Sequence, residues 1–294
     1  MTYQNTWVVA GNIDEFTRTT LPVLAAESTR NTLLLTVFDR LRTEGPHAFG
    51  ERDPQLLTWY DAEGAASGAV LRTPPYAYVL SDVPTASVSA LVDLLSDSES
   101  GLDGREINLP ENREAPFSAA WSARTGKDPQ VLERFRLYRL GELIAPNPAP
   151  LGTSRLATDD DVRLIAGYLE AFWHEVEHSV PADVRGTAVR MAMGRVGEGV
   201  FRLWLDESGT PVSLAGHTPV VAGMSRIGPV YTPPELRGHG YAAGATVAAT
   251  KAALARGADE VLLFTDLANP VSNRLYQRLG YQPVSDRARL SFEG

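Results

Sequence analysis

A short glycine-containing loop in the last third of the chain constrains the fold more than any other segment. It spans residues 237–242 (RGHGYA), follows a strand-like run at residues 225–231 and precedes an alanine-rich helical run at residues 243–255. A glycine turn that opens a helix directs several backbone N–H groups toward one point, and the helix dipole adds partial positive charge there. Glycine also lets an anion approach the backbone closely. The loop therefore predicts a strand–loop–helix unit that holds a phosphorylated cofactor.

The composition limits the compartment and the chemistry. With 294 residues, the chain is long enough for about two domains. No apolar run approaches the roughly 20 residues of a membrane span, and the N-terminus lacks the basic and apolar segments of a signal peptide. The chain contains no cysteine, which excludes disulfides, thiolate nucleophiles and zinc sites built on thiolates. We therefore expect a cytoplasmic protein without a membrane partner.

The net charge bears on the class of partner. It is −9 at pH 7, and the acidic side chains are scattered along the sequence. Because binding to a phosphate backbone needs a basic face, nucleic acid is not expected as a partner. An acidic protein favours cationic or amine-bearing molecules. We therefore expect a small-molecule amine as substrate, and a chain that acts as a monomer or a homodimer.

A proline-rich segment divides the chain into two similar lengths. Residues 141–150 read GELIAPNPAP, with prolines at alternate positions near the end. Such spacing is incompatible with the interior of a helix or of a central strand. We expect a linker here, with one domain at residues 1–145 and a second at residues 146–294.

The second half alternates between helical and strand patterns. Expected strands lie at residues 154–157, 201–205, 212–221, 226–232, 261–265 and 288–292, and expected helices at 160–178, 181–196, 242–256 and 270–279. This alternation is typical of an α/β (α+β) fold, in which helices flank a central mixed sheet.

The first half repeats this order more weakly. A helical pair is expected at residues 14–41, strands at 56–60, 69–72, 77–80 and 134–140, and further helices at 87–96 and 117–124. No glycine loop occupies the place that corresponds to residues 237–242. We therefore expect two domains of one fold in tandem, produced by an internal duplication whose first copy has lost its phosphate site.

A second motif lies downstream of the glycine loop. It opens a short expected helix with proline in the first turn and closes it with glycine, in line with the positional preferences of both residues. Asn269, Asn273 and Tyr276 have the spacing that puts three side chains on one helix face. Together, the two motifs resemble those of the GNAT superfamily of acyl-CoA-dependent N-acetyltransferases over roughly residues 150–294. The first half resembles a degenerate copy of the same domain.

The resemblance implies a cofactor and the residues that hold it. The cofactor is acetyl-CoA, used as a co-substrate, and no metal is implied. The loop amides bind the pyrophosphate, the preceding strand binds the pantetheine arm, and the asparagines of the second motif contact the CoA arm. The residues in these positions are Val230, Tyr231, Thr232, Arg237, Gly238, His239, Gly240, Tyr241, Ala242, Asn269, Ser272, Asn273 and Tyr276. Tyr276 is expected to face the thioester sulfur.

The residue types fit direct transfer of the acetyl group in a ternary complex. An amine attacks the thioester, a backbone N–H stabilises the oxyanion, and CoA leaves as a thiolate. A phenol with a pKa of about 10 stays protonated at neutral pH, so Tyr276 can donate a proton to that thiolate. Many enzymes of this superfamily use a glutamate on the strand before the loop, but residues 224–227 here read MSRI. Asp266, Glu175, His217 and an ordered water are the open candidates for the base.

Residues 174–178 read HEVEH and fit two different sites. The resemblance implies that this segment borders the acceptor pocket. The acceptor-binding residues expected on this basis are His174, Glu175, His178 and His217. The same HExxH pattern fits a zinc hydrolase, in which Glu175 activates water and Glu198 supplies a third ligand.

Two functions other than acetyl transfer therefore remain open from the sequence. One is a zinc hydrolase, and the other is an acyl-CoA-binding sensor or scaffold without turnover. Tyr276 favours the transferase, because CoA binding alone needs no proton donor. A small-molecule amine and a peptide amine both fit the acceptor.

Overall fold

The computed structural model describes residues 3–176 and 183–292, which fold as two compact units. The units comprise the described residues of Met1–Leu137 with Val284–Gly294 (the first unit) and of Tyr138–Pro283 (the second unit). The chain therefore passes between the units at residues 137–138 and again at residues 283–284. The sequence predicts one linker, at residues 141–150.

The first unit is built on a mixed sheet with the strand order β1-β2-β3-β4-β5-β12-β6. Its strands are β1 (Thr6–Val9), β2 (Gln55–Tyr60), β3 (Ala66–Arg72), β4 (Tyr78–Leu80), β5 (Glu106–Pro110), the later part of β12 (Tyr281–Ser291) and the residues of β6 (Gln130–Leu140) up to Leu137. Strands β4 and β5 run parallel, whereas the pairs β1–β2, β2–β3, β3–β4 and β5–β12 are antiparallel.

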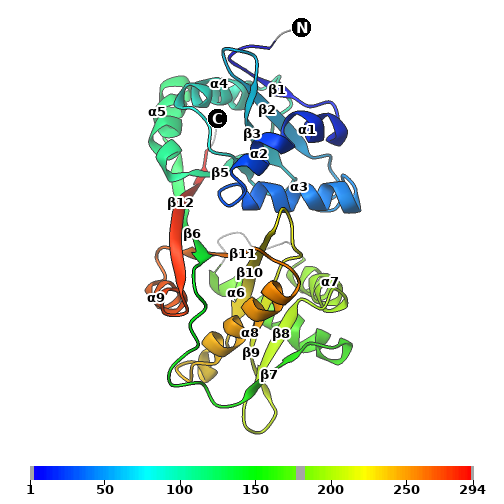
Figure 1. Ribbon diagram of the computed structural model, residues 1–294. Helices are drawn as coiled ribbons and strands as arrows, with labels where there is room; N and C mark the ends of the chain where they lie inside the picture. Colours follow the sequence, from blue (N-terminus) through cyan, green and yellow to red (C-terminus); the bar gives the residue numbers. More distant parts are fainter. Residues whose placement is uncertain (1–2, 177–182, 293–294) are drawn as a thin grey trace. The chain divides into compact units, whose positions relative to one another are not determined.

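Helices cover both faces of this sheet, with α1 to α3 on one side and α4 and α5 on the other (Figure 1). The helices are α1 (Ile13–Thr19), α2 (Leu21–Ala26), α3 (Thr32–Glu44), α4 (Thr85–Ser96), the short η1 (Glu111–Arg113) and α5 (Glu114–Thr125). The core under α4 and α5 is aromatic. Trp121 of α5 stacks on Phe117 and lies 4.6 Å from the ring of Phe292. Phe292 directly follows β12, so the end of the described chain completes this core.

The second unit has the strand order β6-β11-β10-β9-β8-β7. Its elements are β6 (Gln130–Leu140, from residue 138), β7 (Thr153–Leu156), η2 (Asp159–Asp161), α6 (Val162–Val176), α7 (Val184–Gly197), β8 (Phe201–Leu205), β9 (Pro211–His217), β10 (Met224–Tyr231), η3 (Pro234–Leu236), α8 (Tyr241–Ala255), β11 (Glu260–Asp266) and α9 (Pro270–Arg278). Strands β10 and β11 are parallel, and β7, β8, β9 and β10 pair antiparallel in turn.

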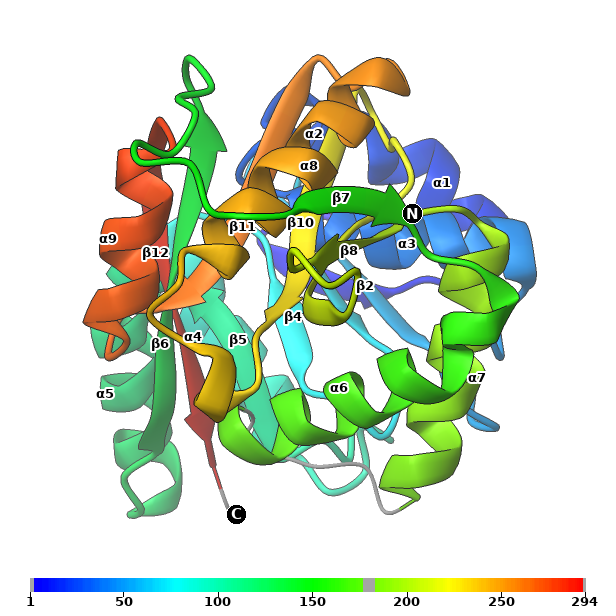
Figure 2. The same cartoon turned by 90° about the horizontal axis from the view of Figure 1, so that it is seen from below.

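The two faces of this second sheet bury different helices, because successive side chains of a strand point to opposite sides. Leu214 of β9 packs in the cluster under α6 and α7, and its neighbour Ala215 packs in the cluster under α8 and α9. Figure 2 shows strands β8 and β10 between α8 on one side and α6 on the other. The mixed α/β architecture predicted from the sequence is therefore observed.

Close packing explains why α8 is rich in small residues. Most of its side chains are buried against the sheet. A Cβ added at Gly244 would lie 2.7 Å from ring carbons of Trp204, closer than carbon atoms pack. Small side chains bring the start of α8 close to the strands, which fixes the position of the loop that precedes the helix.

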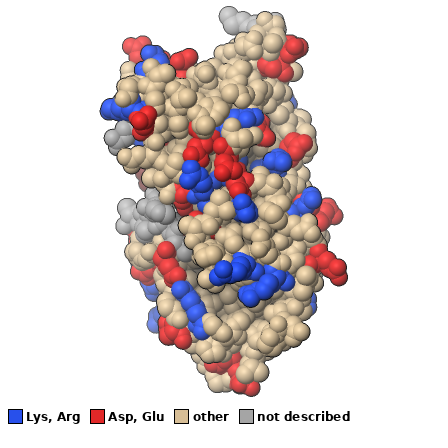
Figure 3. Space-filling model, turned by 90° about the vertical axis from the view of Figure 1, so that its left-hand side faces the viewer, with Lys and Arg blue, Asp and Glu red and all other residues tan. Residues whose placement is uncertain are grey.

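The described surface mixes both signs of charge. Figure 3 shows basic and acidic side chains side by side at several places on one face. Ion pairs such as Arg134–Glu114 and Arg52–Asp103, each at 2.6 Å, join such neighbours. Among the described helices, none combines the length and the apolarity that a bilayer crossing requires.

Candidate active site

The parallel strands β10 and β11 pair at one end and separate at the other. Their register covers residues 224–227 of β10 and 260–263 of β11, although the strands continue to Tyr231 and Asp266. On its other edge β10 stays paired with β9, with a shift in register after Ile227. In a sheet of this class, ligands bind where the carboxyl ends of neighbouring parallel strands part. The geometry therefore offers an unpaired edge of β10 to a ligand.

The glycine loop adjoins this edge and presents free backbone donors. Gly238 and Gly240 have φ angles of 85° and 78°, in the left-handed region that glycine adopts most easily. Within the described chain, no group accepts a hydrogen bond from the N–H of Gly238, His239 or Gly240. A Cβ built on Gly238 would meet no atom within 4 Å. These donors stand at the positive end of α8, which is the arrangement that binds phosphate groups.

Arg237 fastens the loop to its surroundings. Its Nε donates to the carbonyl of Thr232 at 2.9 Å, and its Nη2 donates to Glu175 Oε2 at 2.6 Å. The hydrogen bond that Arg237 donates to Glu175 raises the pKa of Arg237 above its usual range. Glu175, predicted as a base or an acceptor-binding residue, therefore joins the end of α6 to the loop in this structure. Its predicted roles stay predictions.

The end of β10 is held from the β9 side. Ser213 Oγ donates to the carbonyl of Tyr231 at 3.1 Å and lies 2.8 Å from Thr232 Oγ1. The ring of Tyr231 packs against that of Tyr168 at 5.6 Å. Val230 is half-buried beside them. These contacts fix the strand without using the edge that faces away from β9.

The two asparagines of the second motif organise the start of α9. Asn269 Oδ1 accepts from the N–H of Ser272 at 3.0 Å and thus caps the helix. Asn273 Nδ2 donates to the carbonyls of Asp266 and Asn269, both at 2.8 Å. Asn273 Oδ1 accepts from the hydroxyl of Tyr138 at 2.9 Å. The sequence predicted that Asn269, Asn273 and Tyr276 share one helix face. It did not predict the hydrogen bonds that the two asparagine side chains make at the start of α9. The predicted contacts with CoA stay predictions.

Tyr276 is buried with an unengaged hydroxyl. Its side chain is 8 % exposed and packs edge-on against Tyr281, with ring centroids 6.1 Å apart. The structure describes no hydrogen-bond partner for its hydroxyl. Burial raises the pKa of Tyr276 to about 12. The phenol therefore keeps its proton at neutral pH.

Two of the candidate bases are engaged in local structure. Asp266 Oδ1 accepts from the N–H of Ala268 at 2.8 Å and so closes the turn before α9. His217 is fully buried, with Nδ1 2.9 Å from the carbonyl of Thr218. Burial lowers the pKa of His217. Its strand position faces Ile227, in the part of β10 that still pairs with β11.

Arg226 is a charged residue of this sheet that the sequence reading passed over. Burial and the charge of Arg195 lower its pKa to about 10. Its buried Nη1 has no hydrogen-bond partner among the described groups. A basic residue inside an expected strand is the signal that could have identified it. The strand that precedes the loop thus carries a cation and no carboxylate.

The HEVEH segment lies only partly within the described residues. His174 and Glu175 are exposed at the end of α6, and His178 lies outside the described residues. Over residues 3–176 and 183–292, no group of three or more histidine, aspartate or glutamate side chains is arranged to hold a metal ion. Because this search omits His178, it does not test the predicted zinc alternative.

Comparison with known proteins gives these features a context. Residues 166–281 match the model of the acetyltransferase (GNAT) family. None of the curated proteins matches the sequence. The matched range runs from α6 to the first residue of β12 and includes the parting strands, the glycine loop and α9.

Solved structures of similar fold cover nearly the whole chain. A GNAT-family acetyltransferase from Colwellia psychrerythraea is 11 % identical with a TM-score of 0.62, covering 98 % of this chain and all (100 %) of its own. A GCN5-related N-acetyltransferase from Sphaerobacter thermophilus is 16 % identical with a TM-score of 0.61, covering 99 % and 96 %. A tandem GNAT protein from the clavulanic acid biosynthesis pathway is 15 % identical with a TM-score of 0.56, covering 97 % of each chain. These likenesses confirm the predicted fold of two GNAT-like domains in tandem.

Proposed function

We propose, from the match of residues 166–281 to the model of the acetyltransferase (GNAT) family, that the protein transfers an acetyl group from acetyl-CoA to a primary amine. The acceptor is a small molecule or a peptide, and the amine attacks directly in a ternary complex. The observation that carries the proposal is the set of free loop donors beside the parted strands β10 and β11. A family of acyl transferases and a site that accepts a pyrophosphate point to the same co-substrate.

The residues of the second unit fit acetyl-CoA. The amides of Gly238, His239 and Gly240 are free to bind the pyrophosphate, and the space beside Gly238 lets phosphate oxygens approach. The edge of β10 around Val230 and Tyr231 is free to hydrogen-bond the pantetheine arm. Acetyl-CoA supplies the activated thioester. The chain supplies orientation and a proton.

Tyr276 is the proposed proton donor. Its hydroxyl has no other described partner, and its raised pKa of about 12 keeps it protonated throughout the physiological range. It can therefore deliver a proton to a departing thiolate, whose own pKa is about 8.5. A main-chain N–H at the end of β10 is the proposed donor to the oxyanion. Pro229 has no N–H, so Gly228 and Val230 are the proposed residues for this role.

Strand β10 carries no carboxylate that could accept the proton of the attacking amine. Arg226 occupies the strand, so Asp266, Glu175 and an ordered water remain the proposed acceptors. Among these, Glu175 stands on an exposed helix end beside the loop and is the side chain that solvent and acceptor reach most easily. We also propose that His174 and His178 border the acceptor.

Catalysis is assigned to the second half, residues 146–294, and the first half, residues 1–145, is the degenerate copy. In the first unit, β4 runs into α4 through Ser81, Asp82, Val83 and Pro84, with no glycine among them. Without glycine and with proline as the residue before α4, this connection lacks the donors that the loop at residues 237–242 offers.

The experiment that tests the function is a calorimetric titration with acetyl-CoA followed by an amine panel screened for thiol release. The proposal expects stoichiometric binding and thiol release that depends on the amine. Absence of both heat and thermal stabilisation with acetyl-CoA would refute it. Binding without release for every amine would instead support the acyl-CoA-binding sensor.

A further inference from the structure

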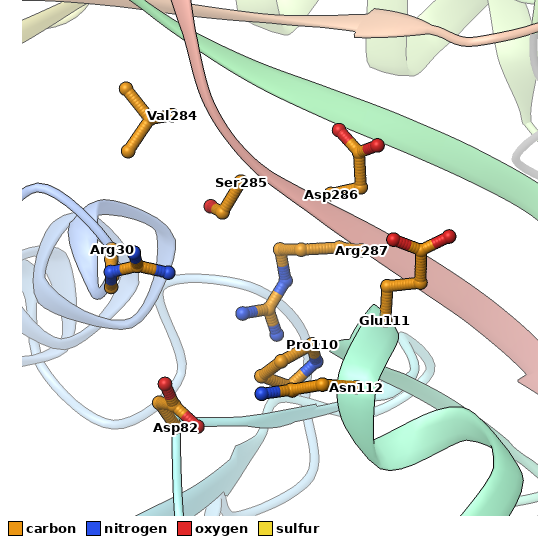
Figure 4. Close-up of a pocket in the computed structure, with 9 residues that line it drawn as sticks. All are labelled: Arg30, Asp82, Pro110, Glu111, Asn112, Val284, Ser285, Asp286 and Arg287. Carbon is orange, nitrogen blue, oxygen red and sulfur yellow. The ribbon is translucent and has the colours of Figure 1, made fainter.

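A cavity in the first unit lies outside the proposed acetyl-transfer site. It has a volume of about 220 Å³ and forms where β4, β5 and β12 meet the connection between α2 and α3 (Figure 4). The lining residues that matter here are Arg30, Asp82, Glu111, Asn112, Asp286 and Arg287. All of them belong to the first unit, so the inference stands independently of acetyl transfer.

Arg287 of β12 fills the place where β4 and β5 stop pairing. The parallel register ends at Val79 opposite Asn108. The Nη2 of Arg287 donates to the carbonyls of Leu80 and Asn108 at 2.7 and 3.0 Å, and its Nε donates to Asn108 Oδ1 at 2.5 Å. Every one of these acceptors is uncharged. The guanidinium is thus fixed in position by neutral groups from both strands.

The positive charge of Arg287 is buried, and the charge of Asp82 offsets the effect of burial only in part. Arg287 is 4 % exposed, and no described carboxylate forms an ion pair with it. Its Nη1 donates to no residue that the structure describes, although Arg287 lines the cavity. Burial lowers the pKa of Arg287 to about 10. A buried charge of this kind is costly unless an anion or further hydrogen bonds compensate it.

The carboxylates around the cavity are mostly neutralised by other arginines. Asp82 pairs with Arg113 at 3.1 Å, and Asp286 pairs with Arg136 through contacts of 2.7 and 2.6 Å. Both acids therefore form their ion pairs with other arginines, and the charge of Asp82 raises the pKa of Arg287 by less than burial lowers it. Neither Asp82 nor Asp286 forms an ion pair with the Arg287 guanidinium, so a bound anion could supply one.

The exposed lining residues add one charge of each sign. Arg30 and Glu111 form no ion pair with a described residue. In Figure 4 the guanidinium groups of Arg30 and Arg287 face the same space, whereas the Glu111 carboxylate points toward the side of Asp286. Because Asp82 and Asp286 are each paired with another arginine, the two guanidinium groups outweigh the Glu111 carboxylate. The resulting excess of positive charge suits a monoanion.

We propose that this cavity binds a small organic carboxylate through Nη1 of Arg287 and the guanidinium of Arg30. Arginine is suited to this task because its planar donors match the geometry of a carboxylate. The side-chain amide of Asn112 is available to a second polar group of the ligand. The cavity is smaller than the roughly 300 Å³ at which pockets for drug-sized ligands begin. It is therefore a site for a small acid and not for CoA.

The ligand class is tested on the full-length protein by calorimetry and by the unfolding temperature. The probes are propionate, L-lactate and inorganic phosphate at constant ionic strength. Saturable heat and a raised unfolding temperature are expected with propionate or L-lactate, with phosphate at least about tenfold weaker. Tighter binding of phosphate, or no saturable heat with either carboxylate, would overturn the proposal.

The site is tested with a matched pair of arginine variants. Arg30→Gln removes an exposed lining guanidinium, and Arg18→Gln removes an exposed arginine of α1 that does not line the cavity. Carboxylate affinity should fall about tenfold or more in Arg30→Gln and stay unchanged in Arg18→Gln. Equal affinities in the two variants would contradict the assignment. Because Arg30 is exposed, its replacement leaves the fold intact even where Arg287→Gln does not fold.

Discussion

Tyr276 shows how burial alone prepares a side chain for one chemical role. Its ring packs against Tyr281, and its pKa rises to about 12 because the charged phenolate would lose its hydration. The hydroxyl is kept out of local hydrogen bonds, unlike the amides of Asn269 and Asn273, which the start of α9 uses. A buried phenol that stays neutral and makes no described hydrogen bond has its proton available for a leaving group.

Replacing Tyr276 by phenylalanine tests this role. The variant Tyr276→Phe removes only the hydroxyl, so the packing persists and the proton donor is lost. We expect kcat to fall about 100- to 10,000-fold while the Kd for acetyl-CoA changes little. Steady-state kinetics and calorimetry measure the two quantities. Tyr76→Phe, at an exposed tyrosine of the first unit, serves as the control, and an unaltered kcat in Tyr276→Phe would remove this residue from the mechanism.

The raised pKa of Tyr276 also predicts how stability depends on pH. The folded-state pKa of about 12 lies above the value of about 10 in an unfolded chain. The stabilising contribution is therefore fully present below about pH 10 and is lost as the pH rises toward about 12. Over that window the free energy of unfolding should fall by about 2 kcal/mol more in the wild type than in Tyr276→Phe. Urea unfolding at several pH values measures this, and parallel curves would contradict it.

The glycine loop and α8 act as one element. The loop is short of side chains and of internal hydrogen bonds, and α8 is held close to the sheet by its small residues, such as Gly244 against Trp204. The position of the free amides is thus set by the packing of α8 together with the contacts of Arg237 with Thr232 and Glu175. Sequence spacing predicted the loop as an anion site, since Gly–x–Gly before a helix is a local pattern. The ion pair between Arg237 and Glu175 joins distant segments and could not be read from that pattern.

A pair of glycine variants separates backbone strain from ligand access. Gly238 in the loop and Gly209 in the turn between β8 and β9 have φ angles of 85° and 82°, and a Cβ on either meets no atom within 4 Å. Alanine at either place therefore costs a similar free energy of unfolding, about 1–2 kcal/mol. Only Gly238→Ala places a methyl group where phosphate oxygens are expected.

The affinity for acetyl-CoA is the quantity that distinguishes this pair. Calorimetry should show a Kd at least about tenfold weaker for Gly238→Ala than for Gly209→Ala. Similar losses of stability in both variants, measured by urea unfolding, confirm that strain is matched. If both variants bind acetyl-CoA as the wild type does, the loop is not the pyrophosphate site.

At the scale of the whole molecule, the order of elements could be predicted better than their long-range partners. The second half was readable because glycine and proline mark the ends of its elements, as at Gly209 and Pro270. The sequence also predicted a strand at the end of the chain, but as part of the second domain. In the structure, residues 287–291 of β12 belong to the first unit, where they pair with β5. A strand pattern gives no sign of which distant strand it pairs with, so neither this return nor the buried Arg287 could be derived from the sequence.

Because β12 and Phe292 belong to the first unit, we expect them to stabilise it. Phe292 is 1 % exposed and packs on Trp121 and Phe117, with ring centroids at 4.6 and 5.5 Å. Phe292→Ala should lower the free energy of unfolding by about 3–5 kcal/mol. Val271→Ala, at a side chain that is 67 % exposed in the second unit, should change it by less than about 0.5 kcal/mol. Equal effects of the two substitutions would show that the terminus does not support the core.

The central claim, acetyl transfer by the second unit, is tested most directly by following the acetyl group. The protein is incubated with isotopically labelled acetyl-CoA and a panel of primary amines, and the products are analysed by mass spectrometry. The account predicts that an amine gains one labelled acetyl group as an equal amount of free CoA thiol appears, and that both yields collapse in Tyr276→Phe. Thiol release at the background rate, with no labelled amine in any reaction, would contradict it.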